Sequence, residues 1–265
     1  MRTPIPLRLV LVLFSLTSLG AAAREDKAAA SAVDAAAKDD KQAQAAGLLP
    51  GEVDTRDRLA TKLPEINVDG VALDEVIDFF RDFSGLNVFV DWPALKAAGV
   101  EQNAPVKVAA QNILVHQAMN KVLESAAGGK KKLRADAVGG VVVVSTPKRV
   151  ETIRAHFRRL KRMEVAGKIG EQLRQPVPEV NFDGTPFEDV VDFLRDVTGA
   201  NIFVDWNALE KAKVDRQTPV NVRLKDVPLD QTLRLILDCA GGNRSVLDFK
   251  VEGNTITVSV APGVA

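Results

Sequence analysis

The sequence predicts an α+β fold with two tandem βαββαββ modules, each a small mixed sheet covered by two helices, and a helix that joins the modules. Two observations support this prediction. Residues 64–145 align without a gap with residues 178–259, and 31 of the 82 aligned positions are identical. In each copy, short alternating apolar segments typical of strands are interspersed with segments whose apolar residues recur every three or four positions, as on one helix face. We therefore expect one small fold to occur twice, as module 1 (residues 61–146) and module 2 (residues 176–261).

The amino-terminal residues predict export from the cytoplasm. Arg2 and Arg8 precede an apolar run at residues 9–19. This run is shorter than the roughly 20 residues of a membrane-spanning helix. Small residues follow this run, so residues 1–23 are interpreted as a signal peptide cleaved after Ala23, with an uncleaved anchor as the alternative. Residues 24–60 are rich in Ala and charged residues and lack aromatic residues, which predicts a flexible tether. This arrangement indicates a periplasmic or cell-envelope location.

The first half of each module predicts a strand followed by a helix. Residues 66–68 alternate as a strand does, and Asp69-Gly70 predicts a turn into the helix. Gly85 in module 1 and Gly199 in module 2 predict left-handed helix ends. The apolar stripe of the helix in module 1 comprises Leu73, Val76, Ile77, Phe80 and Phe83.

Polar residues predict where helices begin. Residues 185–188 of module 2 (Thr-Pro-Phe-Glu) have the spacing of a capping box, so we expect the first helix to start more firmly there than in module 1, by about 1 kcal/mol. A buried strand follows at residues 88–90 and 202–204. Asp91 and Asp205, directly after it, are each expected to cap a short helix.

The second half of each module predicts a strand, a helix and a hairpin. Val106 and Val108 alternate in the strand, and residues 133–137 and 141–144 form the hairpin around Gly139-Gly140. The apolar positions of the helix between them are Val115, Ala118, Met119, Val122, Leu123 and Ala126 in module 1, and Leu229, Thr232, Leu233, Ile236, Leu237 and Ala240 in module 2.

Residues 147–175 predict a basic connecting helix. Val150, Ile153, Phe157 and Leu160 share one face. The basic residues on the rest of the helix are Lys148, Arg149, Arg154, Arg158, Arg159, Lys161 and Arg162. Three interpretations are open: a solvated face on a spacer packed against one module, contact of residues 148–162 with anionic lipid or an acidic partner, and nucleic-acid binding.

Two observations argue against a nucleic-acid partner. The chain has 35 Lys and Arg against 35 Asp and Glu, so its net charge creates no field that favours nucleic acid. The predicted strands also lack the exposed aromatic pairs with which RNA-binding modules of similar element order stack bases.

Two features are candidate partner-binding sites. Trp92 and Trp206 each follow a capping Asp, where an indole either covers the small core or anchors a partner. At an exposed sheet edge, an added partner strand would gain main-chain hydrogen bonds. The candidate residues on such an edge are Val142, Val144, Ile256 and Val258.

The sequence predicts no catalytic, cofactor or metal site. Two carboxylate pairs lie four residues apart beside an arginine, as on a solvated helix face: Asp78 with Asp82, and Asp192 with Asp196. His116 and His156 have no counterparts in the other copy and are interpreted as surface residues. Cys239, the single cysteine, excludes an intramolecular disulfide and is interpreted as a small, semi-buried thiol.

Both modules resemble a known family. The segments LPEINVDGVALDEVIDFF, LNVFVDW and PVNVRLKDVPLDQTLRLIL are similar, in sequence and order, to the short N-terminal domain shared by secretins and TonB-dependent transducers. The resemblance implies a periplasmic domain that docks onto other envelope proteins, which are an inner-membrane platform for secretins and a sigma-regulator receptor for transducers. Because nothing after residue 261 is expected to form a secretin ring or a barrel, we expect the docking module without the pore.

These observations predict a non-enzymatic adaptor or docking protein of the cell envelope, linked to a secretin-type secretion assembly or a TonB-type signalling assembly. The expected partners are envelope proteins, such as a secretin or an inner-membrane platform component. A self-assembling structural component of the envelope is one alternative, and an enzyme with a site between the modules is another.

Overall fold

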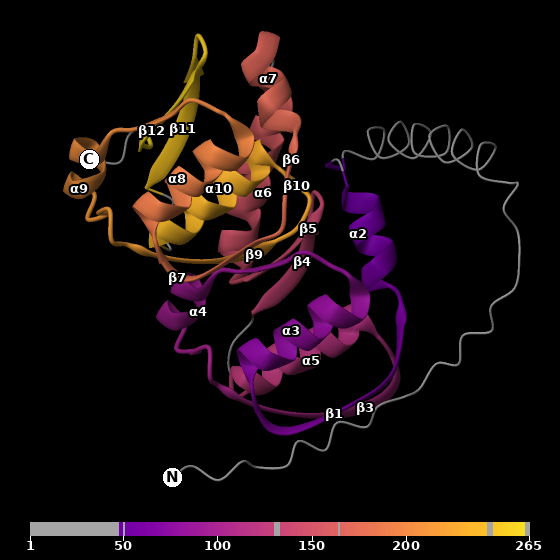
Figure 1. The fold of residues 1–265 in the computed structure, drawn as a ribbon. Coiled ribbons are helices and arrows are strands. Elements are labelled where there is room, and N and C mark those ends of the chain that lie inside the picture. Colours follow the sequence, from indigo (N-terminus) through magenta and orange to yellow (C-terminus); the bar gives the residue numbers. More distant parts are fainter. Residues whose placement is uncertain (1–47, 50, 130–132, 164, 243–245, 263–265) are drawn as a thin grey trace, which may run out of the picture. The chain divides into compact units, whose positions relative to one another are not determined.

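A computed structural model describes residues 48–49, 51–129, 133–163, 165–242 and 246–262, all within one compact unit. This part of the chain has a mixed α+β fold with nine helices and several small sheets, none of which closes into a barrel (Figure 1). None of its helices has the length and apolar character needed to span a bilayer. The expected signal peptide, the cleavage at Ala23 and most of the expected tether lie outside the described residues.

The first half of the described chain contains two small sheets with helices between them. Its elements are α2 (Glu52–Leu59), β1 (Lys62–Ala72), α3 (Leu73–Ser84), β2 (Val88–Val90), α4 (Trp92–Ala97), β3 (Pro105–Leu114), α5 (Val115–Ala126), β4 (Arg134–Val138) and β5 (Val141–Ser145). Strands β1 and β3 pair antiparallel, and a separate sheet has the order β2-β5-β4, with β2 parallel and β4 antiparallel to β5. Helices α3 and α5 lie between the two sheets (Figure 1), so the expectation of a single mixed sheet is corrected to two.

The second half repeats these pairings. Its elements are α7 (Gly167–Arg174), β6 (Pro176–Val177), β7 (Val180–Pro186), α8 (Phe187–Thr198), β8 (Ile202–Val204), α9 (Trp206–Lys211), β9 (Pro219–Leu224), β10 (Val227–Pro228), α10 (Leu229–Ala240), β11 (Leu247–Glu252) and β12 (Thr255–Val260). Strand β7 pairs antiparallel with β9, and the sheet β8-β12-β11 reproduces the directions of β2-β5-β4. The short strands β6 and β10 also pair antiparallel.

The structure extends the repeat toward the amino terminus. Helices α2 and α7 occupy matching places, because Arg58 Nη1 donates to the Gly85 carbonyl at 3.0 Å and Gln172 Nε2, 114 residues after Arg58, donates to the Gly199 carbonyl at 3.0 Å. Leu59 of α2 is buried in the core. Residues 52–59 are therefore an ordered part of the first module, not the end of a flexible tether, because they have apolar and polar partners that a local reading of the sequence does not reveal.

Helix ends follow the predictions better than helix starts do. Gly85 and Gly199 end α3 and α8 in the left-handed conformation, with φ of 64° and 61°. Asp91 and Asp205 cap α4 and α9 by accepting hydrogen bonds from the backbone N–H groups of Ala94 and Ala208. The two glycine ends and the two aspartate caps confirm the predictions, because each is determined by residues within one helical turn.

The expected capping box of module 2 is wrong. Helix α8 begins at Phe187 without a side-chain cap, and its first two N–H groups donate to the Thr218 and Arg216 carbonyls. Helix α3 begins in the same way, on the Ala104 and Gln102 carbonyls. Because distant backbone groups bond the first turn of both helices, neither copy has the advantage that the capping-box spacing predicted.

The expected turn at Asp69-Gly70 is a bulge within β1. The register between β1 and β3 shifts between Asp69 and Val71, and Gly70 has a φ of 73°. A left-handed residue is accommodated in the strand without ending it, because the ladder with β3 continues on both sides. Phe83 also departs from the predicted buried stripe of α3, since it is 41% exposed.

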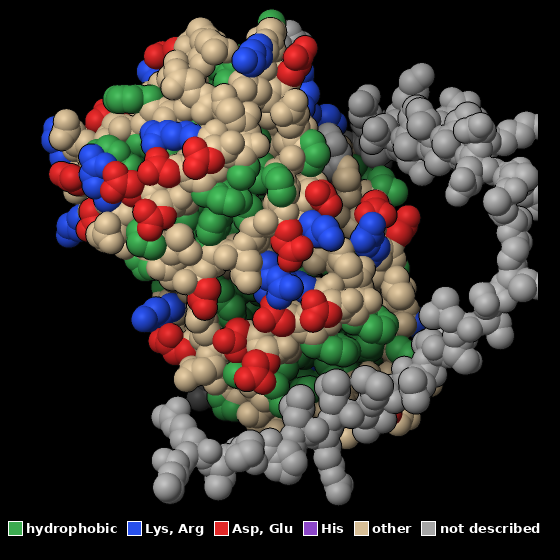
Figure 2. All heavy atoms as spheres, in the orientation of Figure 1, with side chains coloured by type: hydrophobic (Ala, Val, Ile, Leu, Met, Phe, Trp, Pro, Cys, Tyr) green, Lys and Arg blue, Asp and Glu red, His purple; other side chains and the backbone are tan. Residues whose placement is uncertain are grey.

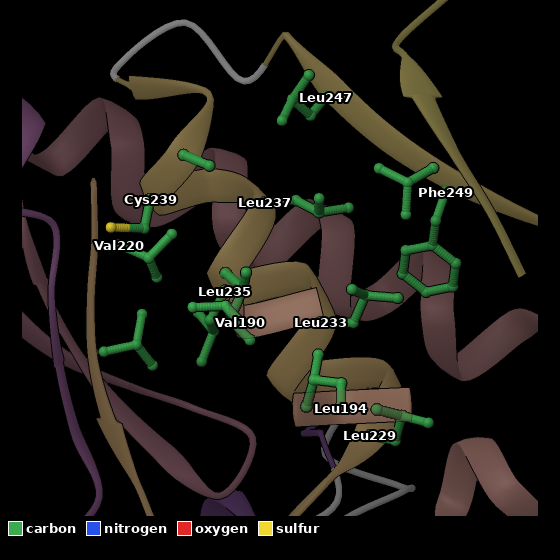
Figure 3. Close-up of a cluster of buried hydrophobic side chains, with 14 of the residues drawn as sticks. Val190, Leu194, Val220, Leu229, Leu233, Leu235, Leu237, Cys239, Leu247 and Phe249 are labelled. Atoms are coloured by element: carbon green, nitrogen blue, oxygen red, sulfur yellow. The ribbon is translucent and has the colours of Figure 1, made fainter. Parts of the chain in front are cut away.

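Helix α6 (Pro147–Arg162) packs between the two halves and joins the outer face of the sheet β2-β5-β4 to the core of the second half, while α3 and α5 belong to a separate core within the first half. A single hydrophobic cluster contains Phe89, Val141 and Val143 of the first half, Ile153 and other residues of α6, and the core of the second half. Helix α10 belongs to this cluster and is buried on all sides. Figure 3 shows Leu233 and Leu237 directed toward β11 and Leu235 and Cys239 directed toward β9.

The connecting helix expected at residues 147–175 is divided into α6 and α7, and α7 begins at Gly167, one of the two glycines expected to break or bend it. The expectation of a solvated spacer packed on one module is wrong for α6, because Arg149 and Arg154 are only 6% and 9% exposed. The sequence does not reveal this burial, since the partners of both arginines lie far away along the chain.

Candidate interaction site

The four strand residues expected at a docking edge are all fully buried. Val142 and Val144 lie on β5, and Ile256 and Val258 lie on β12, each at 0% exposure. Both strands are central in their sheets, so each has a paired strand on either side. Strand addition at these residues is incompatible with this arrangement, and the expectation is corrected: their side chains are core residues.

Trp92 and Trp206 are half-buried and partly available at the surface. The Trp206 ring packs edge-on against Phe187 at 5.6 Å between centroids, and the Arg216 guanidinium lies 4.6 Å above its centroid. Trp92 lines a cavity of about 210 Å³ between the two halves. Both indoles therefore cover the core on one side, and whether they also anchor a partner stays a prediction.

Polar contacts join the two halves beside that cavity. The Asp78 carboxylate accepts hydrogen bonds from Arg81 at 2.6 Å and from Arg223 of the second half at 3.1 Å. The Asn87 side chain forms two hydrogen bonds with the backbone of Lys225, at 2.8 and 3.0 Å. Asp78 is thus a link between the halves as well as a member of a solvated helix face. Figure 2 shows acidic and basic side chains intermixed across the displayed surface.

A buried ionic network holds α6 against both halves. Arg149 Nε donates to Asp91 at 2.9 Å, and its Nη2 lies 3.5 Å from Asp238 of α10. Asp91 also accepts from Ser145 at 3.0 Å, and both carboxylates are 0% exposed. Asp238 further accepts from Arg234 at 3.1 Å. One arginine of α6 thereby connects a carboxylate of each half.

The two buried carboxylates respond oppositely to their surroundings. Burial raises the pKa of Asp91 above its ordinary value, although the Arg149 guanidinium opposes this shift. Burial would also raise the pKa of Asp238, but Arg234, the hydrogen bond with His156 and Arg149 outweigh it, so the pKa of Asp238 is well below its usual range. Because both carboxylates are bonded to arginines within the protein, these interactions indicate that the network holds α6 in position between the two halves.

A second set of contacts fixes the other arginine of α6. Arg154 donates to Glu52 of α2 at 2.9 Å, to the Ala137 carbonyl at 2.8 Å, and to Asp136 at 3.4 Å. Burial alone would raise the pKa of Glu52, but hydrogen bonds from the Leu49 N–H and Arg154 lower it below its ordinary value. Of the seven basic residues of α6, Lys148, Arg158 and Arg162 are exposed and have no side-chain hydrogen bond or ion pair within the described part of the chain. The anionic contact expected at residues 148–162 therefore rests on these three.

The histidines and the cysteine are integrated into the packing. His116 Nδ1 lies 3.2 Å from the Leu59 carbonyl, and His156 Nδ1 lies 3.5 Å from Asp238, so both are half-buried and not ordinary surface residues. Cys239 is 3% exposed, and burial raises the pKa of its thiol to about 11. In the described part of the chain, no group of three or more His, Cys, Asp or Glu side chains is placed to hold a metal ion.

A larger cavity of about 750 Å³ lies among α6, α7 and α10. Phe157, Leu160 and Leu173 contribute apolar walls, and Asp230 and Arg174 contribute charged groups. Burial raises the pKa of Asp230 above its ordinary value. The cavity is lined by two acidic residues, Asp230 and Glu171, and no hydrogen bond or ion pair between them is found within the described residues.

The sheet β8-β12-β11 has an uncovered face, which we term the open face and define by Phe203, Asp205, Lys250, Thr255, Thr257 and Ser259. Phe203, Thr257 and Lys250 are neighbours across the three strands. Phe203 is 56% exposed, the highest value among the exposed large hydrophobic residues of the described chain. The open face therefore carries an apolar side chain that water surrounds on one side.

The matching face of the first half is covered. Phe203, Thr255 and Thr257 correspond to Phe89, Val141 and Val143, which are 1%, 0% and 0% exposed because α6 packs on them. The sequence analysis did not single out the open face. A comparison of the two copies held a signal for it, since the phenylalanine is kept while both valines of the covered face become threonines.

No family model, curated protein or solved structure matches this chain.

Proposed function

We propose that this chain is a non-enzymatic adaptor of the periplasm or cell envelope, built from two tandem βαββαββ modules of the type that resembles the short N-terminal domain of secretins and TonB-dependent transducers. Its role would be to hold an envelope protein, such as a component of a secretin-type or TonB-type assembly. The observation that carries the proposal is the open face, because the equivalent face of the first half is filled by a helix of the same chain.

The interior of the molecule supports a binding role over a chemical one. Two buried carboxylates with shifted pKa values, Asp91 and Asp238, are both engaged by Arg149 of α6, and Asp238 is also engaged by Arg234. Such groups are perturbed because they hold the structure, which is the common alternative to catalysis for a shifted pKa. The exposed apolar side chains, by contrast, are available to a partner.

Site-directed photocrosslinking in the native cell tests the proposal. The crosslinking amino acid would replace Phe79, Trp206 or Phe203 in separate full-length variants, with Lys96, an exposed residue of α4, as the matched control position. We expect at least one of the three apolar positions to capture an envelope protein that the control does not capture.

The other outcomes decide between the alternatives. Crosslinks only to a second copy of the chain would favour the self-assembling structural component. Crosslinks at none of the three positions would contradict the adaptor proposal. Recovery of the full-length chain in the cytoplasm, with no difference when residues 1–23 are deleted, would contradict the envelope location.

A further inference from the structure

The contacts of α6 with the first half show what kind of element the matching face of the second half could bind. On the sheet β2-β5-β4, α6 packs apolar residues such as Ile153 on Phe89, Val141 and Val143. Its first turn places Arg149 on Asp91 at 2.9 Å. Five residues later, Arg154 approaches Asp136 at 3.4 Å. The face therefore binds an amphipathic helix whose two charged residues fix its direction and register.

The open face keeps part of this arrangement and changes the rest. Asp205 and Ser259 occupy the places of Asp91 and Ser145, and Phe203 occupies the place of Phe89. Asp205 is half-buried and accepts the capping hydrogen bond from Ala208, but no ion pair to it is found among the described residues. Its counterpart in the first half is bonded to an arginine of the covering helix.

The charge at the other end of the face is reversed. Lys250 stands where the first half has Asp136. Its ammonium group contacts Glu252 at 2.7 Å in a pair whose two side chains are each 62% exposed, and such a surface pair is weak and readily exchanged. A helix on the open face would therefore meet a carboxylate near its first turn and an ammonium group about five residues later.

We propose that the open face binds one amphipathic helix of a protein partner, with an Arg or Lys in its first turn on Asp205 and an Asp or Glu five residues later on Lys250. The inference rests on the proposed function and names the partner's binding element. Apolar side chains between the two charges would cover Phe203, as α6 covers Phe89. Thr255 and Thr257 replace the valines of the covered face, so exposing the open face to water costs less free energy. The partner helix can therefore dissociate without leaving a large apolar surface exposed.

A second copy of the chain is a poorer occupant than a different partner. In the part of the chain that the structure describes, the helix that fits such a face, α6, is already buried between the two halves, with Arg149 engaged by Asp91 and Asp238. On the open face of a neighbouring copy, Arg154 would also lie against Lys250, and like charges at close range repel.

The probe is a synthetic peptide with the 16-residue sequence of α6, labelled with a fluorophore and carrying the change Arg154→Glu. Its binding to the full-length protein would be followed by fluorescence anisotropy and compared with that of the unchanged α6 peptide. We expect the charge-matched peptide to bind more tightly, and Asp205→Asn to weaken its binding about fivefold, since a partly exposed ion pair contributes about this much. Asparagine caps helices as well as aspartate does, so α9 should remain intact in this variant.

Two further variants of the protein make the test specific. Lys250→Glu should reverse the preference, so that the unchanged α6 peptide binds more tightly than the charge-matched one. Phe203→Ala should weaken both peptides. Asp192→Asn and Phe83→Ala, at exposed positions on α8 and α3, should change neither affinity.

The inference is overturned if neither peptide binds at concentrations up to about 1 mM. It is also overturned if Asp205→Asn leaves the affinity of the charge-matched peptide unchanged, if Lys250→Glu leaves the preference between the two peptides unchanged, or if the Phe83 variant weakens binding as much as the Phe203 variant. Capture of an envelope protein by crosslinks from Phe79 or Trp206 in the same chain would then leave the adaptor function standing without a helix on the open face. Loss of all crosslinks would contradict the function itself.

Discussion

Replacement of Arg149 by methionine tests whether α6 is locked between the halves. The side chain is 6% exposed and bridges Asp91 at 2.9 Å and Asp238 at 3.5 Å, both of them 0% exposed. Methionine retains most of the aliphatic volume and removes the charge. Loss of one partner from a buried ion pair leaves a carboxylate poorly compensated, which costs about 3–5 kcal/mol. We expect the free energy of unfolding of Arg149→Met to fall by that amount near neutral pH.

The pH dependence of this loss has a definite sign. Burial already raises the pKa of Asp91 while Arg149 opposes the shift, so removal of Arg149 should raise it further. A carboxyl group whose pKa is raised in the folded state stabilises that state at low pH, and the stabilisation is lost as the pH rises through the folded-state pKa. The difference between the variant and the parent protein should therefore narrow as the pH is lowered from about 8 to about 5.

Urea unfolding of the full chain, followed by tryptophan fluorescence and far-ultraviolet circular dichroism, measures both effects. Arg158→Met is the matched control, because Arg158 is exposed on the same helix, and it should change stability by no more than about 0.5 kcal/mol. A loss below about 1 kcal/mol for Arg149→Met near neutral pH, or a loss that does not narrow as the pH is lowered, would refute the reasoning. It would mean that α6 is not held between the halves by this network.

Three further predictions follow from the packing. Variants with a single tryptophan, Trp92→Phe and Trp206→Phe, should show coincident urea transitions, because α6 packs on the sheet of the first half and shares the core of the second half; two separate midpoints would contradict this. Val143→Thr should destabilise the protein by about 1–3 kcal/mol by burying a hydroxyl group, whereas the matching Thr257→Val should change stability by less than about 0.5 kcal/mol; equal effects in urea unfolding would argue against the open face. Because the pKa of the buried Cys239 thiol is about 11, a thiol-reactive dye should label the folded protein very slowly at pH 8 and rapidly in urea, and fast labelling without denaturant would disprove its burial.

Features determined by neighbouring residues could be predicted from the sequence. The buried stripes of α3 and α5 follow from apolar periodicity, the ends at Gly85 and Gly199 follow from the freedom of glycine at positive φ, and the caps at Asp91 and Asp205 follow from their position after a strand.

Features that depend on distant partners could not be predicted. Arg149 and Arg154 look like surface residues on a basic helix, but they bond to carboxylates 58 and 102 residues away. The sequence predicts a strand at Val142 from its periodicity, but periodicity does not show whether other strands pair with it on both sides. The expected exposed edge at Val142 is therefore wrong. The sequence also could not show that two sheets, not one, enclose the helices.

The candidate site illustrates the same limit. Nothing local distinguishes Phe203 from Phe89, since each is the middle residue of a three-residue strand, between a β-branched residue and a valine. Their exposures of 56% and 1% differ only because α6 lies on one of them. Whether this face is exposed depends on whether a helix packs on it. The sequence of one module does not contain that information.

Because the two halves of this chain repeat the same strand pairings, each position in one half can be compared with its counterpart in the other. The pairs Val141 with Thr255 and Val143 with Thr257 differ by little more than one methyl group exchanged for a hydroxyl, yet they mark where one copy has gained a neighbour and the other faces solvent. In duplicated chains generally, an apolar-to-polar difference between matching strand positions could be used to locate the surface on which the copies stopped being equivalent. Such a surface can be found before any relative of the protein is known.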